Sequence, residues 1–232
     1  MKKYSSSKFL TLRSKKNVEI EYPVIDNTNF GAKNASDISS HLAQLYFLAH
    51  LLKPRNIVEL GTRDGESTRA LRKAAVELGI KGISVDLNSA PNETFKNHDS
   101  WNHVQEDDIA FAAKLLNKEY CHKILGSESI DFLFIDTSHE YLHTKRELQS
   151  YWPLLSKRSA LILHDTNLSV EKKFDVDGRL YSGWNNSRGV TKAVEEFFDI
   201  QINEKTVFSK LIGDCVFFHV PWNNGMMIVL KL

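Results

Sequence analysis

Carboxylate and imidazole side chains occur in this sequence directly after short apolar runs. Asp136 ends one such run, His164 and Asp165 end another, and His139 comes three residues after Asp136. Two carboxylates at neighbouring strand ends would repel each other, so a cation between Asp136 and Asp165 is favoured over helix capping or a salt bridge. An imidazole, whose unperturbed pKa is about 6.5, can remove a proton near neutral pH. The pattern predicts a site at which a divalent cation activates a hydroxyl group. His139 is either the general base of this site or a structural hydrogen-bonding residue.

A turn with two glycines follows an earlier apolar run, in the stretch NIVELGTRDGEST. Gly61 and Gly65 lie between a short strand and a helical pattern, an arrangement that brings backbone N–H groups and a helix N-terminus to a small ligand. Asp86 follows Gly65 by about twenty residues, the distance at which a βαβ unit presents a carboxylate to a ribose. The spacing Gly-x-x-x-Gly differs from the Gly-x-Gly-x-x-Gly of dinucleotide sites. The turn therefore predicts a ribose-containing ligand, and a tight turn without a ligand is the alternative.

Glu59 is an acidic residue inside this apolar run. An unpaired charge inside a buried strand is costly, which argues against a solvated or capping carboxylate. We therefore expect Glu59 to bind either the amino group of the ligand or the backbone amides of the turn.

Composition places the chain among soluble globular proteins. It has 232 residues, of which 42% are hydrophobic and 25% charged, and a net charge of +1 gives no reason to expect nucleic acid or a membrane as partner. Cys121 and Cys215 have no metal-type spacing and are expected to be free thiols in a reducing compartment. The basic first residues lack the apolar core of a signal peptide, and no apolar run approaches the roughly 20 residues that span a bilayer. We expect a cytoplasmic protein.

Hydrophobic periodicity predicts strands alternating with helices from Ser36 onward, after an N-terminal extension of residues 1–35. The extension either orders against a partner subunit or the ligand, or is a partly disordered leader. The predicted α/β domain, 36–232, is a doubly wound, mostly parallel seven-stranded sheet with helices on both faces and an antiparallel C-terminal edge hairpin. Strands are expected at 56–60, 81–86, 101–105, 129–136, 160–163, 215–220 and 226–232, and helices at 36–52, 67–78, 109–117, 141–155 and 190–198.

The stretch 166–189 has no sustained periodicity. A connection of this length in a compact domain is usually functional. Tyr181 and Trp184 are either ordinary loop anchors or a lid over a second substrate, which Arg188 would also contact.

The order of the strand ends resembles the class I S-adenosylmethionine-dependent methyltransferases. The turn VELGTRDG is similar to their first motif, Asp86 to the ribose-binding acid after the second strand, and Asp107 to the polar residue near adenine. The resemblance covers roughly Ser36 to the C-terminus and implies a Rossmann-like methyltransferase fold with S-adenosylmethionine as cofactor. The residues expected to hold this methyl donor are Glu59, Gly61, Thr62, Arg63, Gly65, Ser67, Asp86, Leu87, Asp107, Asp108 and Asp136.

The stretch IDFLFIDTSHEYLHTKRELQSYWPLLSKRSALILHDTN resembles a bacterial subgroup with macrocin-type sugar O-methyltransferases and cephalosporin-hydroxylase-like proteins. In that subgroup an Asp and a later acidic pair bind a divalent cation, and the His of Asp-x-x-His-x-Tyr is the general base. The resemblance implies a cation on Asp136, His164 and Asp165, with His139 and Tyr141 beside the acceptor. His164 stands where the macrocin type has an acid, and Arg158-Ser159 replaces its Gly-Gly. Magnesium is the expected cation but prefers oxygen ligands, so manganese or another cation is an alternative.

Taken together, these features predict a dimeric, cation-assisted O-methyltransferase that acts on a hydroxyl of a sugar or a glycosylated or secondary metabolite. Methyl transfer from a sulfonium is an in-line displacement, so the protein mainly positions the two reactants while the cation and the base activate the hydroxyl. Two other classes stay open: an NAD-linked oxidoreductase, and a non-catalytic accessory or binding subunit of a biosynthetic enzyme. The sequence does not decide the acceptor, nor whether oxygen or nitrogen is methylated.

Overall fold

The computed structural model describes residues 36–89, 99–168 and 188–232 in full. Elsewhere it describes only the backbone of four strands, which form two separate antiparallel pairs. These are β1 (Phe9–Arg13) with β2 (Glu19–Pro23), and β8 (Lys173–Phe174) with β9 (Leu180–Ser182). Trp184, the side chain of Tyr181 and the rest of residues 1–35 lie outside the described residues, so the predictions made for them stay predictions.

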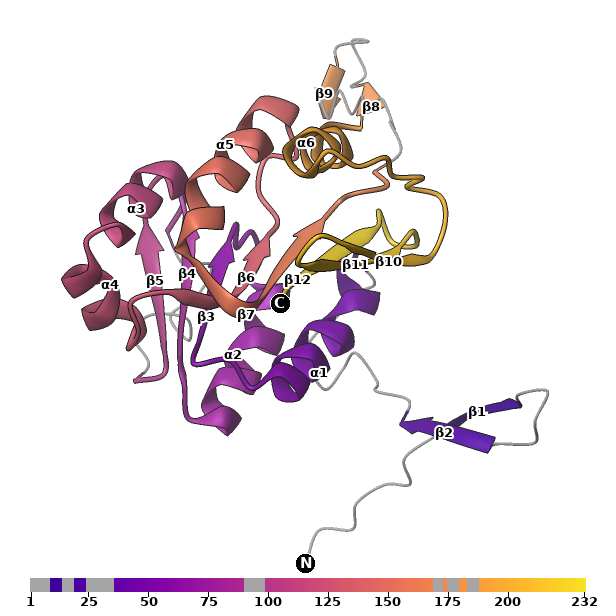
Figure 1. Ribbon diagram of the computed structural model, residues 1–232, viewed down its shortest axis with the longest axis horizontal. Coiled ribbons are helices and arrows are strands. Elements are labelled where there is room, and N and C mark those ends of the chain that lie inside the picture. The colour runs from indigo at the N-terminus through magenta and orange to yellow at the C-terminus, as the bar shows by residue number, and fades with distance from the viewer. Residues whose placement is uncertain are drawn as a thin grey trace, which may run out of the picture.

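An eight-stranded mixed sheet forms the centre of the fold (Figure 1). Its strand order is β10-β11-β12-β7-β6-β3-β4-β5, and all pairs from β7 to β5 are parallel. The chain runs from β3 outward to β5 and then returns to β6 on the other side of β3. Ligands of doubly wound sheets bind at such a reversal, beyond the carboxyl ends of the strands. The strands are β3 (Asn56–Leu60), β4 (Lys81–Asp86), β5 (Trp101–Gln105), β6 (Ile130–Ile135), β7 (Leu155–His164), β10 (Phe208–Ile212), β11 (Cys215–Val220) and β12 (Met226–Lys231).

The predicted C-terminal hairpin is present, since β11 pairs antiparallel with β12 and β12 with β7. The antiparallel C-terminal edge of the sheet is therefore confirmed, whereas the predicted count of seven strands was wrong, because β10 pairs with the outer side of β11. No residue of β10 is buried, so its sequence lacks the alternation that marks a half-buried strand. Helix α4 (Lys118–Leu125) was missed as well, because it is short and its start depends on an Asn117 cap that accepts from Tyr120 N.

Helices cover both faces of the sheet, as predicted (Figure 1). One face packs against α1 and α2, and the other against α3, α4, α5 and α6. None of the helices in the fully described ranges is long and apolar enough to cross a membrane. The remaining helices are α1 (Leu42–Leu52), after a 3-10 turn at Ser39–His41, α2 (Glu66–Leu78), α3 (Asp108–Leu115), α5 (Tyr141–Tyr151) and α6 (Gly189–Phe198).

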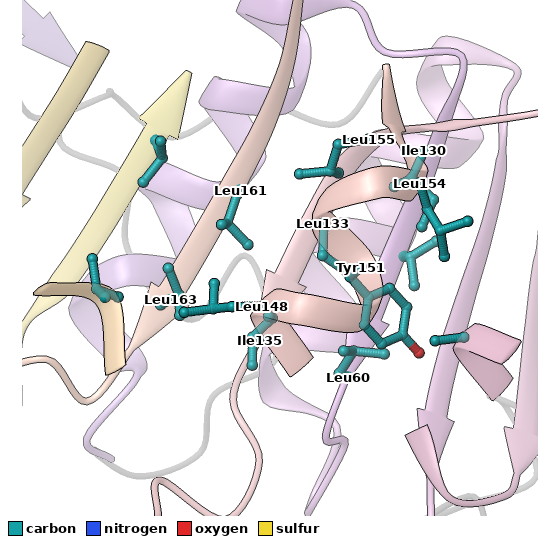
Figure 2. Packing of buried hydrophobic residues seen from close by; sticks show 14 of the residues in the cluster. Leu60, Ile130, Leu133, Ile135, Leu148, Tyr151, Leu154, Leu155, Leu161 and Leu163 are labelled. Atoms are coloured by element: carbon teal, nitrogen blue, oxygen red, sulfur yellow. The ribbon is translucent and has the colours of Figure 1, made fainter. Parts of the chain in front are cut away.

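The core fixes the start of α3 relative to α5. Leu148 and Tyr151 of α5 lie in one buried cluster with Leu60, Leu133 and Ile135 of the central strands (Figure 2). The hydroxyl of the buried Tyr151 donates to the backbone oxygen of Asp108 at 2.6 Å. This packing holds the ends of β3 and β6 and the helices α3 and α5 in one arrangement, and it positions the polar residues beyond them.

Candidate active site

A cavity of about 550 Å³ lies beyond the ends of β3, β4 and β6, where the strand order reverses. Most of the residues predicted to hold a methyl donor line this cavity, and Glu59 and Gly65 do not. The predicted residues that line it are Gly61, Thr62, Arg63, Ser67, Asp86, Leu87, Asp107, Asp108 and Asp136. The other lining residues are Ile38, Asp64, Glu66, Val85, Asn88, Thr137, Ser138, His139, Glu140 and His143.

The glycine turn packs directly on the end of β6. Gly61 has φ +85°, a left-handed conformation that side chains rarely adopt, and a Cβ there would lie 2.1 Å from the backbone oxygen of Asp136. Gly65 has φ 74° and starts α2. The first glycine is therefore required by the close approach of two strand ends, and the second by the turn into the helix.

Asp86 closes the turn from β4. One of its carboxylate oxygens accepts from the backbone N–H of Thr62 at 2.7 Å, and the other accepts from the backbone N–H of Asn88 at 2.8 Å. The hydroxyl of Thr62 is buried and has no hydrogen-bond partner among the described residues. The turn thus offers both a carboxylate and an unpaired hydroxyl to a polar ligand in the cavity.

An ion pair covers one side of the turn. The Arg63 guanidinium makes two contacts with the Asp37 carboxylate, at 2.8 and 3.1 Å. Burial would raise the pKa of Asp37, but the Arg63 charge outweighs it and holds that pKa below its usual range. Sequence reasoning missed Asp37, because nothing in the spacing shows that the residues before α1 reach this turn.

Glu59 holds the start of α2 against the sheet. It is fully buried and accepts hydrogen bonds from Ser67 and Thr68, both at 2.7 Å, and from Ser84. These three hydroxyls replace the amino group or turn amides expected from the sequence, and the carboxylate lies outside the cavity lining. Burial raises the pKa of Glu59 to about 7, although the three hydroxyls oppose that shift.

Replacing Glu59 by glutamine is expected to remove a pH dependence of stability. Because folding raises this pKa from its ordinary 4.5 to about 7, the group stabilises the fold fully below pH 4.5 and loses that contribution as the pH rises through 7. Between pH 4.5 and 8 the free energy of unfolding of wild type should fall by up to about 3 kcal/mol more than that of Glu59→Gln. Urea unfolding across this range measures the difference, with the exposed Glu119→Gln as control; parallel curves for Glu59→Gln and wild type would contradict the assignment.

Asp136, His139 and Asp165 come together beyond the ends of β6 and β7. His139 Nε2 lies 3.0 Å from Asp165 Oδ2, and His139 Nδ1 lies 4.0 Å from Asp136 Oδ1. His139 and Asp165 both have left-handed backbones, at φ 57° and 59°. Such conformations cost of order 1 kcal/mol or more and cluster at functional sites. Gly189, at the start of α6, packs directly against the His139 backbone and helps to hold it in place. The contact is so close that a Cβ on Gly189 would lie 2.3 Å from the backbone oxygen of His139.

His164 is buried beside the same two carboxylates. Its Nδ1 lies 3.4 Å from Asp136 Oδ1 and 3.2 Å from Asp165 Oδ2. Burial lowers the pKa of His164, but the two carboxylates outweigh burial and raise it to about 10. In turn, burial would raise the pKa of Asp136, and the charge of His164 lowers it to about 2. At His164, where the resembling subgroup has an acid, the two carboxylates therefore favour a positive charge, carried either by the protonated imidazole or by a bound cation that replaces its proton.

The donor set here fits a divalent cation. One ligand atom from each of Asp136, His139 and Asp165 lies within 4.8 Å of the others. Asp165 Oδ1 is buried and has no hydrogen-bond partner among the residues that the structure describes. The predicted ligand His164 contacts the same carboxylates. The imidazoles of His139 and His164 thus both lie beside the carboxylates of Asp136 and Asp165. From the sequence, His164 was predicted as a ligand and His139 as the base.

The remaining predicted residues lie around the cavity or away from it. Asp107 caps α3 by accepting from Ala110 N at 2.8 Å. The Tyr141 hydroxyl donates to Glu196 on α6, and Tyr141 does not line the cavity. The guanidinium of Arg188 is paired with Glu195 and Glu204, each at 3.0 Å, so its predicted substrate contact has no support in this geometry.

Comparison with known proteins adds a family match. The model of a family described as "Methyltransferase domain" matches residues 58–166, from β3 to just after β7. A curated relative from Sinorhizobium fredii (strain NBRC 101917 / NGR234), named "Uncharacterized protein y4gI", is 30% identical over 129 residues. The alignment covers 53% of this chain but 14% of that protein, so the chain corresponds to a small part of this relative.

Solved structures of several methyltransferases have the same fold as this chain. An O-methyltransferase from Bacillus cereus in complex with SAH (S-adenosylhomocysteine) is 15% identical, with a TM-score of 0.54 over 88% of this chain and 86% of that chain. The SAH-bound methyltransferase PaMTH1 from Podospora anserina is 14% identical, with a TM-score of 0.55 over 90% and 83%. TomG, an O-methyltransferase of tomaymycin synthesis from Streptomyces achromogenes in complex with SAM, is 14% identical, with a TM-score of 0.55 over 88% and 85%. At these identities the likeness is one of fold.

Proposed function

We propose that this chain, a class I S-adenosylmethionine-dependent methyltransferase with the Rossmann-like fold of that class, methylates a hydroxyl group of a small molecule. The observation that carries the proposal is the arrangement around the cavity. The glycine turn and Asp86 lie at the ends of β3 and β4, and Asp136 and His139 follow β6. A donor held by the turn, with its ribose on Asp86, would share the cavity with an acceptor beside His139.

In this proposal the chain positions the acceptor and removes its proton. Asp165 lies behind His139, outside the cavity lining, and holds the imidazole at Nε2. With Nε2 donating to Asp165, Nδ1 is the nitrogen that accepts the proton of the acceptor hydroxyl. The acceptor oxygen then displaces S-adenosylhomocysteine from the methyl carbon in line, and effective positioning of the two reactants supplies much of the rate.

A divalent cation is the second part of the proposal. Asp136 and Asp165 would supply its oxygen ligands and His164 a nitrogen ligand, with His139 within reach of the same position. When bound, such a cation lowers the pKa of an acceptor hydroxyl and orients it. Magnesium is expected if carboxylate oxygens dominate, and manganese if an imidazole binds.

Chelation is expected to lower methyl transfer by at least about 10²-fold, because a hydroxyl acceptor is a poor nucleophile without the cation. The measurement compares turnover of the full chain after treatment with a chelator and after addition of Mg²⁺ or Mn²⁺ to the same sample. Recovery on addition supports the cation, and equal activity with the chelator present would rule out the cation-assisted mechanism.

The acceptor class rests on the resemblance to the macrocin-type subgroup, which implies a sugar hydroxyl or another secondary metabolite. The cytoplasmic location and the dimer are separate predictions from the sequence. An assay with methyl-labelled S-adenosylmethionine and a panel of sugars, glycosylated metabolites and phenols tests this class. Donor binding without transfer to any member of the panel would instead favour a non-catalytic accessory subunit. Transfer to amines but not to alcohols would overturn the assignment to oxygen.

A further inference from the structure

A second group of metal-binding side chains lies in the wall of the same cavity. It consists of Asp108 at the start of α3 and His143 and Glu147 on α5. His143 and Glu147 are four residues apart, so they share one face of the helix. We propose that Asp108, His143 and Glu147 bind a divalent cation of the borderline type, such as Zn²⁺ or Co²⁺. This site is separate from the Asp136 and Asp165 pair, but Asp108 is also among the residues expected to hold the methyl donor.

The distances fit such a cation. His143 Nε2 lies 2.9 Å from Asp108 Oδ2 and 3.6 Å from Glu147 Oε1, and one ligand atom of each residue lies within 4.8 Å of the others. Ligand atoms about 2.0–2.2 Å from a tetrahedral Zn²⁺ lie roughly 3.4 Å apart, a value between the two distances from His143 Nε2. A small movement of His143 away from Asp108 would open the central position.

Glu147 gives independent support for a ligand. Its side chain is fully buried, and Oε2 has no hydrogen-bond partner in the described part of the chain. The other oxygen accepts from the hydroxyl of Thr137 at 2.7 Å, which fixes the carboxyl group facing His143 and Asp108. A buried carboxylate oxygen without a partner is costly, so a cation at this position, or a proton shared with Asp108 in its place, is expected.

The local charge balance points the same way. Asp108 is buried as well, and its second oxygen accepts from the backbone N–H of Ile109 at 2.7 Å. Among the described residues, no Lys or Arg forms an ion pair with Asp108 or Glu147. Other charged groups that act on the cluster are Asp107, Asp136 and Arg146. Burial and the neighbouring Asp108 raise the pKa of Glu147, so without a cation a proton on Glu147 takes the place of the missing counter-charge. A divalent cation would displace this proton and supply the charge itself.

The ligand types select the kind of cation. One imidazole and two carboxylates suit zinc, cobalt or manganese better than magnesium, which prefers oxygen ligands in an octahedral arrangement. Three protein ligands leave a fourth position open, as in zinc sites that bind water or a substrate. Asp108 and His143 line the cavity, so this open position would face a molecule bound there.

The test counts Co²⁺ bound to the full chain by equilibrium dialysis with metal analysis. His143→Gln should bind one Co²⁺ per chain fewer than wild type, whereas His122→Gln, which changes an exposed histidine on α4, should bind as many as wild type. His139→Gln should keep the site at His143. An unchanged count in His143→Gln, or no Co²⁺ bound to wild type at all, would overturn the proposal.

Glu147→Gln gives a second readout, which separates cation binding from a purely structural role. Without metal, this variant should melt at or above the wild-type temperature, because glutamine has the same shape as the carboxyl group and places no buried charge beside Asp108. Saturating Co²⁺ should raise the melting temperature of wild type by several degrees and that of Glu147→Gln by less than half as much. An equal rise in both proteins, or a metal-free variant that melts well below wild type, would contradict the proposal.

Discussion

Replacing Asp165 by alanine is expected to lower kcat by at least about 10³-fold while changing the Kd for S-adenosylhomocysteine by less than about threefold. Asp165 is almost fully buried and lies outside the cavity lining, so its loss removes no direct contact with the donor. It holds His139 Nε2 at 3.0 Å and supplies a carboxylate to the proposed cation. The same side chain therefore serves both parts of the proposed activation of the acceptor.

Asp165→Asn is the matched control for backbone strain. Asp165 has φ 59°, a conformation that asparagine tolerates better than alanine does. If the carboxylate charge is what matters, both variants lose turnover to a similar extent, and both keep the wild-type near-ultraviolet circular dichroism. Steady-state kinetics and calorimetric titration with S-adenosylhomocysteine measure the two effects. An asparagine variant with near wild-type kcat would show that the charge of Asp165 has no part in catalysis.

Gly61→Ala is expected to destabilise the protein by about 3 kcal/mol or more and to abolish donor binding. The new Cβ would lie 2.1 Å from the backbone oxygen of Asp136, and the residue would also keep a φ of +85°. Because backbone and not a flexible side chain occupies that space, either the glycine turn or the end of β6 must move. Both carry residues that line the cavity, so a displacement of either would change the donor site.

Gly79→Ala separates the two contributions. Gly79 ends α2 with φ +67°, and a Cβ there would meet nothing within 4 Å. It should cost only the strain of the left-handed conformation, about 1 kcal/mol, and leave donor binding unchanged. Urea unfolding of the two variants gives the difference directly. Equal destabilisation by both alanines would mean that the contact between Gly61 and Asp136 does not constrain the turn.

The sequence predicted the parallel half of the sheet well, because buried parallel strands are continuous apolar runs that end in polar residues. The boundaries of β4, β5 and β11 agree with the prediction, and α2 begins one residue earlier than expected. Helix α5 ends at Tyr151 and not at Leu155, because Pro153 lies in a 3-10 turn and the following residues begin β7. Hydrophobic periodicity did not show this boundary, because the apolar residues at the end of the helix are followed directly by the apolar residues of the 3-10 turn and of β7.

The candidate site was predicted as a set of strand ends but not as a set of contacts. Asp136, His139 and Asp165 were expected together and lie together. The Glu59 partners were not foreseen, because Ser67, Thr68 and Ser84 are ordinary polar residues whose hydroxyls converge only after α2 packs on β3. His143 and Glu147 read as two polar positions on a helix, and Asp108 reaches them only through the turn after β5.

The central claim is that the cavity binds a methyl donor of the S-adenosylmethionine type, and thermal shift with S-adenosylhomocysteine and with NADH tests it most directly. At a concentration about 100 times its Kd, S-adenosylhomocysteine should raise the melting temperature by roughly 5 °C or more, and NADH at the same concentration should not. Asp86→Asn should reduce the shift, because Asp86 is the residue proposed to hold the ribose. A shift with NADH but none with S-adenosylhomocysteine would contradict the proposed function.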